Sequence, residues 1–198
     1  MSRRRLVIGL ITAAVLAVLV VGLTQAGSKS KKADQASMSL AEQRAELAGA
    51  PAPLAALHAQ ASRLLESGPT AFRRRLAVLR AAGYPVVVNK WAAWCPPCRL
   101  EFPVFQRLAV KYGKQVAFVG LDGHDSTGQA RTFLRQVPLS YPSYSDPNER
   151  AAHTLGAGTL YPTTVFIDAK GNRTTHQGGY TDDAALERDI RRYALGRA

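Results

Sequence analysis

The fold of this chain is decided by residues 91–103, which read Trp-Ala-Ala-Trp-Cys-Pro-Pro-Cys-Arg-Leu-Glu-Phe-Pro. This stretch holds both cysteines of the 198-residue protein, Cys95 and Cys98. The residues just before it, 84–91, include three consecutive valines and predict a buried β-strand. Apolar residues recur at helical spacing from Leu100 onward and predict an α-helix. The two cysteines therefore lie where a strand passes into a helix.

The position of the cysteine pair indicates redox chemistry. Cys95 would cap the predicted helix, and Pro96 would occupy its first turn, where a missing N–H costs nothing. Unpaired backbone N–H groups and the helix dipole at this end both favour a thiolate. Cys98, one turn further along, is placed to attack a mixed disulfide formed by Cys95. We therefore interpret the pair as a redox couple.

Two other uses of a cysteine pair fit this pattern less well. A structural staple would close only a two-residue gap between a turn and a helix start. A zinc site needs two further ligands, whereas His124, His153 and His176 are dispersed along the chain. We expect no metal site, and no cofactor apart from the redox-active disulfide Cys95–Cys98 itself.

The composition indicates a globular protein with a basic surface. Hydrophobic residues make up 46% of the chain, and the net charge is +12. Residues 69–198 carry 18 Lys and Arg against 10 Asp and Glu, mostly scattered along the sequence. We interpret these charges as a solvated surface, with attraction to an anionic membrane as the functional alternative. Nucleic-acid binding is not expected, because no supporting motif is present.

The N-terminal residues predict a membrane anchor. Three arginines, residues 3–5, precede an uncharged apolar run over residues 6–23. A helix of this length rises about 27 Å, enough to cross a hydrocarbon core. We expect an uncleaved single-pass anchor in the cytoplasmic membrane, with the globular domain on the extracytoplasmic side. The alternative is a signal peptide cleaved near Ala26, which would release a secreted protein.

Shifts in composition divide the chain into three parts. Residues 1–26 are the predicted anchor or signal peptide, residues 27–68 a polar linker with a helical extension, and residues 69–198 the globular domain. Within the extension, helices are predicted over residues 40–47 and 54–65. The second helix carries one apolar stripe that is too short for a coiled coil, so it should pack on the domain.

The remaining segments alternate between helices and strands. Besides residues 84–91, strands are predicted over residues 116–121, 141–145, 163–168 and 173–177. Helices are predicted over residues 69–82 and after three capping residues, Ser126, Asp146 and Thr181. This order predicts an α/β fold with a mixed central sheet flanked by helices.

Residues 88–103 resemble the active-site signature of the TlpA/ResA-like thioredoxin family, whose members are membrane-anchored extracytoplasmic thiol–disulfide oxidoreductases. The resemblance extends from about Tyr84 to the C-terminus. A bare Cys-x-x-Cys would be weak evidence, but here Trp94 precedes it and Pro103 follows it. A Tyr-Pro-Thr-Thr run at residues 161–164 lies before a predicted strand. Together these features make the motif specific.

The resemblance implies a thioredoxin fold and a role for each matching residue. Cys95 is the exposed nucleophile, Cys98 the resolving thiol, and Pro103 the kink in the active-site helix. Pro162 is the cis-proline that faces the disulfide. The implied substrate-binding residues are Trp94, Pro96, Pro97, Thr163 and Tyr161, whose backbone meets an extended substrate. Residues 122–160 would include the central strand–helix insertion of the family.

Four features depart from related patterns. Asn89 stands where cytoplasmic thioredoxin has a buried aspartate that moves protons to the second cysteine. Glu101 matches a functional glutamate of the ResA-like branch and could accept that proton, the alternative being an exposed helix acid. Lys90 takes a place usually filled by an aromatic residue, and its charge must find a partner or reach water. Residues 40–82 look helical, where many members have a β-hairpin.

The expected function is thiol–disulfide exchange on protein substrates by a monomeric enzyme. We expect a reductase of protein disulfides, of the cytochrome c maturation type, regenerated by a membrane electron donor. The alternative is an oxidase of protein thiols that passes electrons to a membrane acceptor. A metal- or substrate-binding chaperone with the same fold is the alternative from another class. A thiol peroxidase is less favoured, because the motif is not a lone peroxidatic cysteine.

Overall fold

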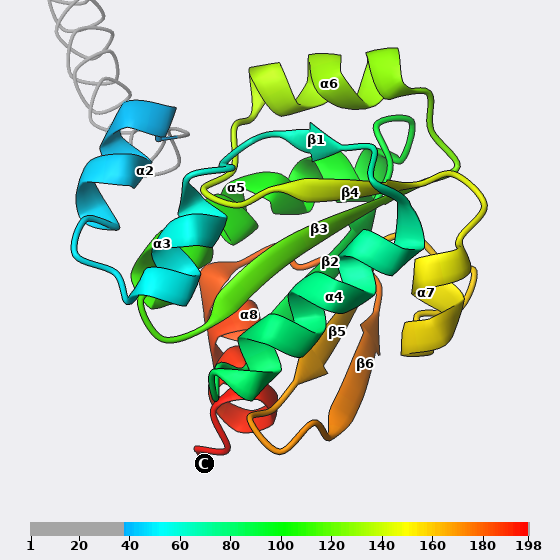
Figure 1. Ribbon diagram of the computed structural model, residues 1–198. Coiled ribbons are helices and arrows are strands. Elements are labelled where there is room, and N and C mark those ends of the chain that lie inside the picture. The colour runs from blue at the N-terminus through cyan, green and yellow to red at the C-terminus, as the bar shows by residue number, and fades with distance from the viewer. Residues whose placement is uncertain (1–37, 198) are drawn as a thin grey trace, which may run out of the picture. The chain divides into compact units, whose positions relative to one another are not determined.

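The computed structural model describes residues 38–197, so the predicted anchor over residues 6–23 lies outside the described residues. Within them, six strands form one mixed sheet in the order β1-β4-β3-β2-β5-β6 (Figure 1). β2 is parallel to β3, β3 to β4 and β4 to β1, whereas β5 is antiparallel to both β2 and β6. The bounds are β1 (Leu64–Leu65), β2 (Val86–Trp91), β3 (Ala117–Gly123), β4 (Ser143–Asp146), β5 (Thr163–Ile167) and β6 (Arg173–Gln177).

Helices cover both faces of this sheet (Figure 1). They are α2 (Leu40–Glu46), α3 (Ala52–His58), α4 (Gly68–Ala81), α5 (Pro96–Tyr112), α6 (Thr127–Gln136), α7 (Arg150–Leu155) and α8 (Asp183–Asp189), followed by a π-helical segment, Ile190–Ala194. One core cluster contains side chains of α5, α6 and α8, and the other contains those of α3, α4 and α7. The predicted α/β fold with a flanked mixed sheet is therefore confirmed. No helix among residues 38–197 is long and apolar enough to cross a membrane.

The central strand β2 is buried along its whole length, and its side chains alternate between the two faces. Val87 and Trp91 belong to the core cluster that includes α5. Val86 and Val88 belong to the cluster that includes α4. By this alternation Asn89 faces α5, and Lys90 faces the opposite side of the sheet.

The prediction of one helix over residues 54–65 is wrong in its second half. α3 ends at His58, and Leu64–Leu65 form a short strand parallel to β4. Ser62 between them has a left-handed backbone with φ of 58°. Hydrogen bonding to the open edge of β4 outweighs the weak helical preference of this segment.

The segment before α4 packs on the domain, as predicted. Leu54 and Leu57 of α3 are completely buried in the same cluster as Phe72 of α4. Gln43 of α2 is also fully buried and donates a hydrogen bond to the carbonyl of Pro138 at 3.0 Å. Residues 38–68 therefore contribute both core side chains and the edge strand β1.

The helix predicted to begin at Asp146 begins later. The Asp146 carboxylate does accept the N–H groups of Ala151 and Ala152, at 2.9–3.1 Å. However, Glu149 has a left-handed backbone with φ of 54°, so α7 begins only at Arg150. The residues between form a turn rather than a first helical turn.

The predicted N-cap residue is correct for α6 and wrong for α8. Ser126 caps α6 as predicted, its hydroxyl accepting the N–H of Gln129 at 3.3 Å. α8 is capped by Asp182 instead of Thr181, with its carboxylate accepting the N–H of Ala185 at 2.8 Å. A carboxylate satisfies the free N–H and also interacts favourably with the helix dipole, which a hydroxyl does not.

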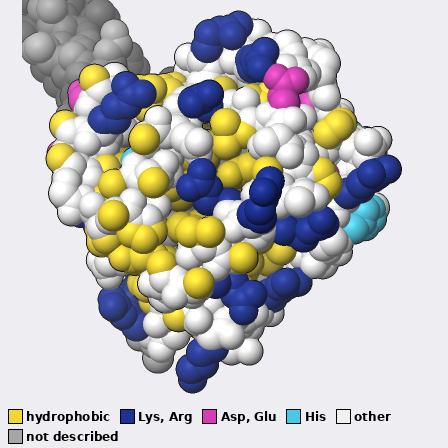
Figure 2. Space-filling view, in the orientation of Figure 1, with side chains coloured by type: hydrophobic (Ala, Val, Ile, Leu, Met, Phe, Trp, Pro, Cys, Tyr) yellow, Lys and Arg dark blue, Asp and Glu magenta, His cyan; other side chains and the backbone are white. Residues whose placement is uncertain are grey.

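The surface over α4 is basic. This helix carries Arg73, Arg74, Arg75 and Arg80 and no acidic residue. Figure 2 shows that Lys and Arg predominate over Asp and Glu on this face. They are interspersed with hydrophobic and neutral side chains, which agrees with a solvated basic surface.

Candidate active site

The two cysteines lie at the carboxyl end of β2, where α5 begins. They form a disulfide with a Cα–Cα distance of 5.3 Å. Cys95 is the N-cap residue of α5, and its sulfur accepts the N–H of Cys98 at 3.2 Å. Pro96 and Pro97 occupy the first turn and are exposed. The predicted strand–cysteine–helix junction is thus confirmed, and Pro103 lies inside α5.

The prediction that Cys95 is exposed is wrong for this disulfide form. Only 2% of Cys95 is accessible, and Cys98 is completely buried. In this form the Cys95 sulfur is bonded to Cys98 and accepts the N–H of the same residue. Neighbouring apolar side chains are exposed instead, with Trp94 at 52% and Leu100 at 71%.

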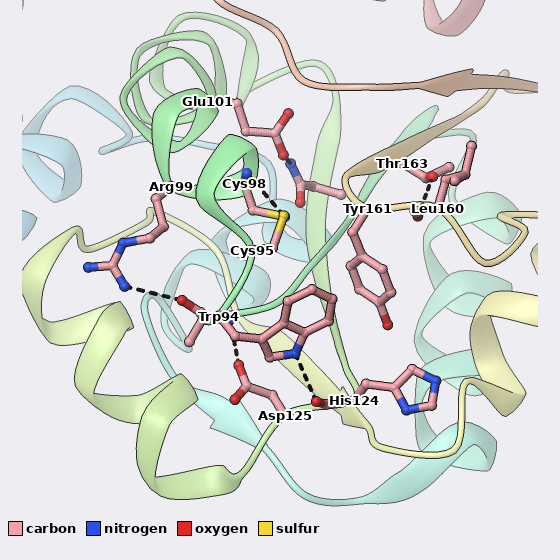
Figure 3. Close-up of a disulfide and its surroundings, with 12 residues drawn as sticks. Trp94, Cys95, Cys98, Arg99, Glu101, His124, Asp125, Leu160, Tyr161 and Thr163 are labelled. Atoms are coloured by element: carbon pink, nitrogen blue, oxygen red, sulfur yellow. Dashed lines mark hydrogen bonds between the residues drawn. A yellow bond between two sulfur atoms is a disulfide. The ribbon is translucent and has the colours of Figure 1, made fainter.

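Trp94 and Tyr161 form an apolar rim beside the disulfide (Figure 3). Their ring centroids are 5.2 Å apart. The indole N–H of Trp94 donates to the carbonyl of His124 at 2.9 Å. His124 follows β3, so this bond ties the rim to the end of a neighbouring strand. Leu160, 55% exposed, precedes Tyr161 and adds further apolar surface.

The loop that leads into the motif is fixed by two charged side chains. The carboxylate of Asp125 accepts the N–H of Ala93. The guanidinium of Arg99 donates to the carbonyl of the same residue at 3.1 Å, and Figure 3 shows it pointing away from the disulfide. Asp125 was missed in the sequence, where its only signal is its position next to the helix cap Ser126.

Pro162 is joined to Tyr161 by a cis peptide bond, as the resemblance implies. A Cβ built on Gly179 would lie 3.4 Å from both the Pro162 ring and the Pro97 carbonyl oxygen. The cis-proline therefore lies close to the first turn of α5. Thr163 is completely buried, and its hydroxyl donates to the Leu160 carbonyl at 2.8 Å. Its side chain is therefore directed away from solvent.

Glu101 is completely buried, which excludes an exposed helix acid. It accepts a hydrogen bond from the Asn89 side chain at 2.7 Å and one from the Tyr180 N–H at 3.3 Å. Burial raises the pKa of Glu101 to about 8, although both hydrogen bonds favour the carboxylate. Cys98 lies one turn earlier on the same helix, so the two side chains are neighbours. Glu101 can therefore exchange a proton near neutral pH.

A second buried carboxyl group, Asp122, lies near the carboxyl end of β3, beside the end of β2. It is 1% exposed and pairs in register with Trp91. Burial, together with the negative charge of Asp125, raises the pKa of Asp122 to about 8. Sequence reasoning missed this residue, because an acid at a strand end usually reaches solvent.

Lys90, for which the sequence offered no partner, is paired with Glu149. Its ammonium nitrogen lies 2.5 Å from a carboxylate oxygen of Glu149 and donates to the carbonyl of Gly158 at 2.7 Å. The hydroxyl of Tyr161 donates to the same carboxylate oxygen at 2.6 Å. The charge of Lys90 is thus compensated within the fold.

Among residues 38–197 no group of three or more His, Cys, Asp or Glu could hold a metal ion.

Replacing Gly123 with Ala is expected to destabilise the fold by about 1–3 kcal/mol. A Cβ at Gly123 would lie 2.1 Å from the Tyr161 hydroxyl oxygen, so the tyrosine must move away from Glu149. Urea unfolding of the oxidised protein measures this loss.

The control for this substitution is Gly128→Ala, because a Cβ at Gly128 meets nothing within 4 Å. Adding Tyr161→Phe to Gly123→Ala should restore at least half of the lost stability, since the clashing hydroxyl is gone. A double variant no more stable than Gly123→Ala would contradict this account.

The chain is similar to a family profile and to several curated proteins. The profile of the AhpC/TSA family matches residues 70–173. The thiol-disulfide oxidoreductase ResA of Bacillus anthracis is 34% identical over 90 residues, 45% of this chain and 51% of that protein. The thioredoxin-like protein YneN of Bacillus subtilis (strain 168) is 33% identical over 94 residues, 46% of this chain and 54% of that protein. The chain thus spans about half the length of the curated relatives it matches.

Two solved structures are similar to the domain. The thiol:disulfide interchange protein DsbE from Chlorobium tepidum is 34% identical with a TM-score of 0.50, covering 55% of this chain and 78% of that chain. MTB DsbF is 29% identical with a TM-score of 0.51, covering 55% and 79%. These likenesses confirm the thioredoxin fold and the predicted resemblance to ResA-like proteins. Since the family profile matches more than half of the sequence, this chain belongs to the AhpC/TSA family.

Proposed function

We propose that this protein is a thiol–disulfide oxidoreductase that acts on protein substrates through Cys95 and Cys98. The observation that carries the proposal is the Cys95–Cys98 disulfide at the start of α5, next to the cis-proline Pro162. The relatives named as thiol-disulfide oxidoreductases support it. We also propose that residues 6–23 anchor the protein in a membrane, with the globular domain on the extracytoplasmic side.

In the reductive direction, the reaction takes two exchange steps. The Cys95 thiolate attacks a substrate disulfide, forming a Cys95–substrate disulfide and releasing one substrate thiolate. Cys98 then loses its proton and attacks the Cys95 sulfur, which releases the second substrate thiolate. Two electrons have passed to the substrate, and the Cys95–Cys98 disulfide has formed. The reverse sequence oxidises a substrate dithiol.

Glu101 is the proposed acceptor of the Cys98 proton. Its pKa of about 8 lies near the operating pH, where a group exchanges protons most effectively. Asn89 holds one carboxylate oxygen of Glu101, at 2.7 Å, and so orients it. In this proposal the pair Asn89 and Glu101 replaces the buried aspartate of cytoplasmic thioredoxin.

The substrate would dock on the apolar rim formed by Trp94 and Tyr161. Cys95 is buried in the oxidised form, whereas its chain neighbours Trp94, Pro96 and Pro97 are exposed. An extended segment could pair with the backbone at Tyr161, before β5. We propose that such segments belong to apocytochrome c during its maturation, with a membrane protein donating the electrons.

The reduction potential of the full-length protein tests the direction of electron flow. Equilibration with a glutathione or dithiothreitol series should give a value near −270 mV, the approximate potential of thioredoxin, for a reductase. A value near −120 mV, as for DsbA, would contradict the reductase and favour the oxidase of protein thiols. Stoichiometric metal binding without any disulfide exchange would favour the chaperone instead.

A further inference from the structure

Four polar side chains meet on the face of β2 opposite Glu101. They come from separate segments: Lys90 from β2, His124 from the loop after β3, Glu149 from the turn before α7, and Tyr161 from the loop before β5. Glu149 is at the centre. One of its oxygens contacts Lys90 at 2.5 Å and Tyr161 at 2.6 Å, and the other lies 3.2 Å from the imidazole of His124.

The ion pair at the centre of this cluster is almost inaccessible to water. Side-chain exposure is 1% for Lys90 and 5% for Glu149. The Lys90 nitrogen also lies 4.0 Å from the centroid of the Tyr161 ring, a cation–π distance. Burial alone would raise the pKa of Glu149, but the hydrogen bonds from Lys90 and Tyr161 hold it below its usual value. A buried pair is maintained only when both charges are satisfied, as they are here.

The backbone is strained at two members of the cluster. His124 has a φ of 50° and Glu149 a φ of 54°. Within residues 38–197, Ser62 is the only other non-glycine residue with a positive φ. Glutamate rarely adopts this left-handed conformation, which costs free energy. Strain of this kind is concentrated at active sites, ligand clamps and switch regions.

The cluster is connected directly to the rim on which a substrate would dock. The Tyr161 ring lies under Lys90 and contacts the Trp94 ring, with centroids 5.2 Å apart. The carbonyl of His124 holds the Trp94 indole. Figure 3 shows the Tyr161 ring between the disulfide loop and His124, with its hydroxyl pointing away from the cysteines. Loss of Glu149 would therefore release the hydroxyl end of Tyr161.

We propose that Glu149, with Lys90 as its charge partner, is a positioning residue for substrate docking. It holds Tyr161, and through Tyr161 the Trp94 rim and the loop that carries Pro162. This inference rests on the proposed function and deepens it by naming a residue that affects substrate docking. Glu149 lies in the insertion predicted within residues 122–160. The insertion thus supplies a determinant of substrate recognition without touching the reacting sulfur atoms.

Two variants test this role from different directions. Tyr161→Phe removes only the hydroxyl group that donates a hydrogen bond to Glu149. The double variant Lys90→Met with Glu149→Met removes both charges together, so that neither is left buried and unpaired, and also removes the acceptor of the Tyr161 hydroxyl. Both are assayed with an extended peptide that carries one internal disulfide, with dithiothreitol as the electron donor, and separately with dithiothreitol alone.

We expect KM for the peptide to rise about tenfold in both variants, with kcat within about twofold of wild type. The rate of reaction of the Cys95–Cys98 disulfide with dithiothreitol should also stay within about twofold, because so small a reagent needs no rim. Acrylamide quenching of tryptophan fluorescence should increase. Trp91 is completely buried, so this change reports Trp94.

A second Lys–Glu–Tyr cluster provides the matched control. Lys111 contacts Glu187 at 2.7 Å, and the Tyr112 hydroxyl donates to Glu187 at 2.6 Å. This cluster joins α5 to α8 and is partly exposed. Lys111→Met with Glu187→Met should leave KM for the peptide within about twofold.

An unchanged KM in Tyr161→Phe would overturn the positioning role, and so would an equal loss of the peptide and dithiothreitol rates. If the double variant does not fold, Tyr161→Phe decides the question. A wild-type protein without peptide turnover would overturn the proposed function together with this inference. An active wild type with unchanged variants would overturn the inference alone.

Discussion

Cys98→Ser is expected to accumulate a covalent adduct with substrate, whereas Cys95→Ser should form none. In the proposed reaction Cys95 makes the mixed disulfide and Cys98 resolves it, so removing Cys98 stops the reaction after the first bond. Either substitution should lower turnover roughly 10³-fold or more, because the two thiols act as a unit. Mass spectrometry of the protein mixed with a disulfide-containing peptide measures the adduct.

The control for the trapping experiment is the variant that lacks both cysteines, which should form no adduct. The order of the two thiols follows from their places in α5. Cys95 is the N-cap residue and its sulfur accepts the N–H of Cys98, whereas Cys98 is one turn inside the helix and completely buried. An adduct on Cys98 in Cys95→Ser, with none on Cys95 in Cys98→Ser, would show that the assignment is reversed.

The free energy of unfolding is expected to fall as pH rises from about 4.5 to about 8. Glu101 ionises near pH 4.5 in the unfolded chain, but burial raises its pKa to about 8 in the folded protein. Between these values the folded state holds one more proton than the unfolded state, so rising pH favours unfolding. The loss is about 1.4 kcal/mol per pH unit, or roughly 5 kcal/mol across the window.

Denaturant unfolding at several pH values measures this slope, on the oxidised protein so that no thiol titrates. Glu101→Gln should remove the part of this slope that one titrating proton contributes to the free energy of unfolding. Asp122→Asn should remove a similar share, since burial and Asp125 raise the pKa of Asp122 to about 8 as well. The double variant should no longer lose stability with rising pH, and should gain a little, because burial lowers the pKa of the His58 imidazole. A slope that survives both substitutions would show that neither carboxyl group is protonated in the folded state.

The local features of the site could be predicted from the sequence. Three consecutive valines before the motif do form a central strand, and Cys95 does cap the helix that follows. Each of these features depends on residues within one or two turns of each other. The resemblance added the cis bond before Pro162, which the structure contains.

Features that depend on distant contacts could not be predicted. The strand at Leu64–Leu65 exists because β4 offers an open edge, and local propensity favoured a helix there. Cys95 is buried in the disulfide form, although the resemblance implied an exposed thiol. The pair Asp122 and Asp125 became recognisable only when the register placed the end of β3 beside Trp91.

Lys90 and Glu101 illustrate most clearly the difference between local features and features that depend on distant contacts. The sequence by itself determined that a charge lies in the central strand and an acid lies one turn from Cys98, because strand and helix periodicity are local. Only the tertiary structure decided that Glu149 compensates Lys90 and that Asn89 contacts Glu101. Burial and charge pairing depend on which segments the sheet brings together, and these partners have no fixed spacing along the chain.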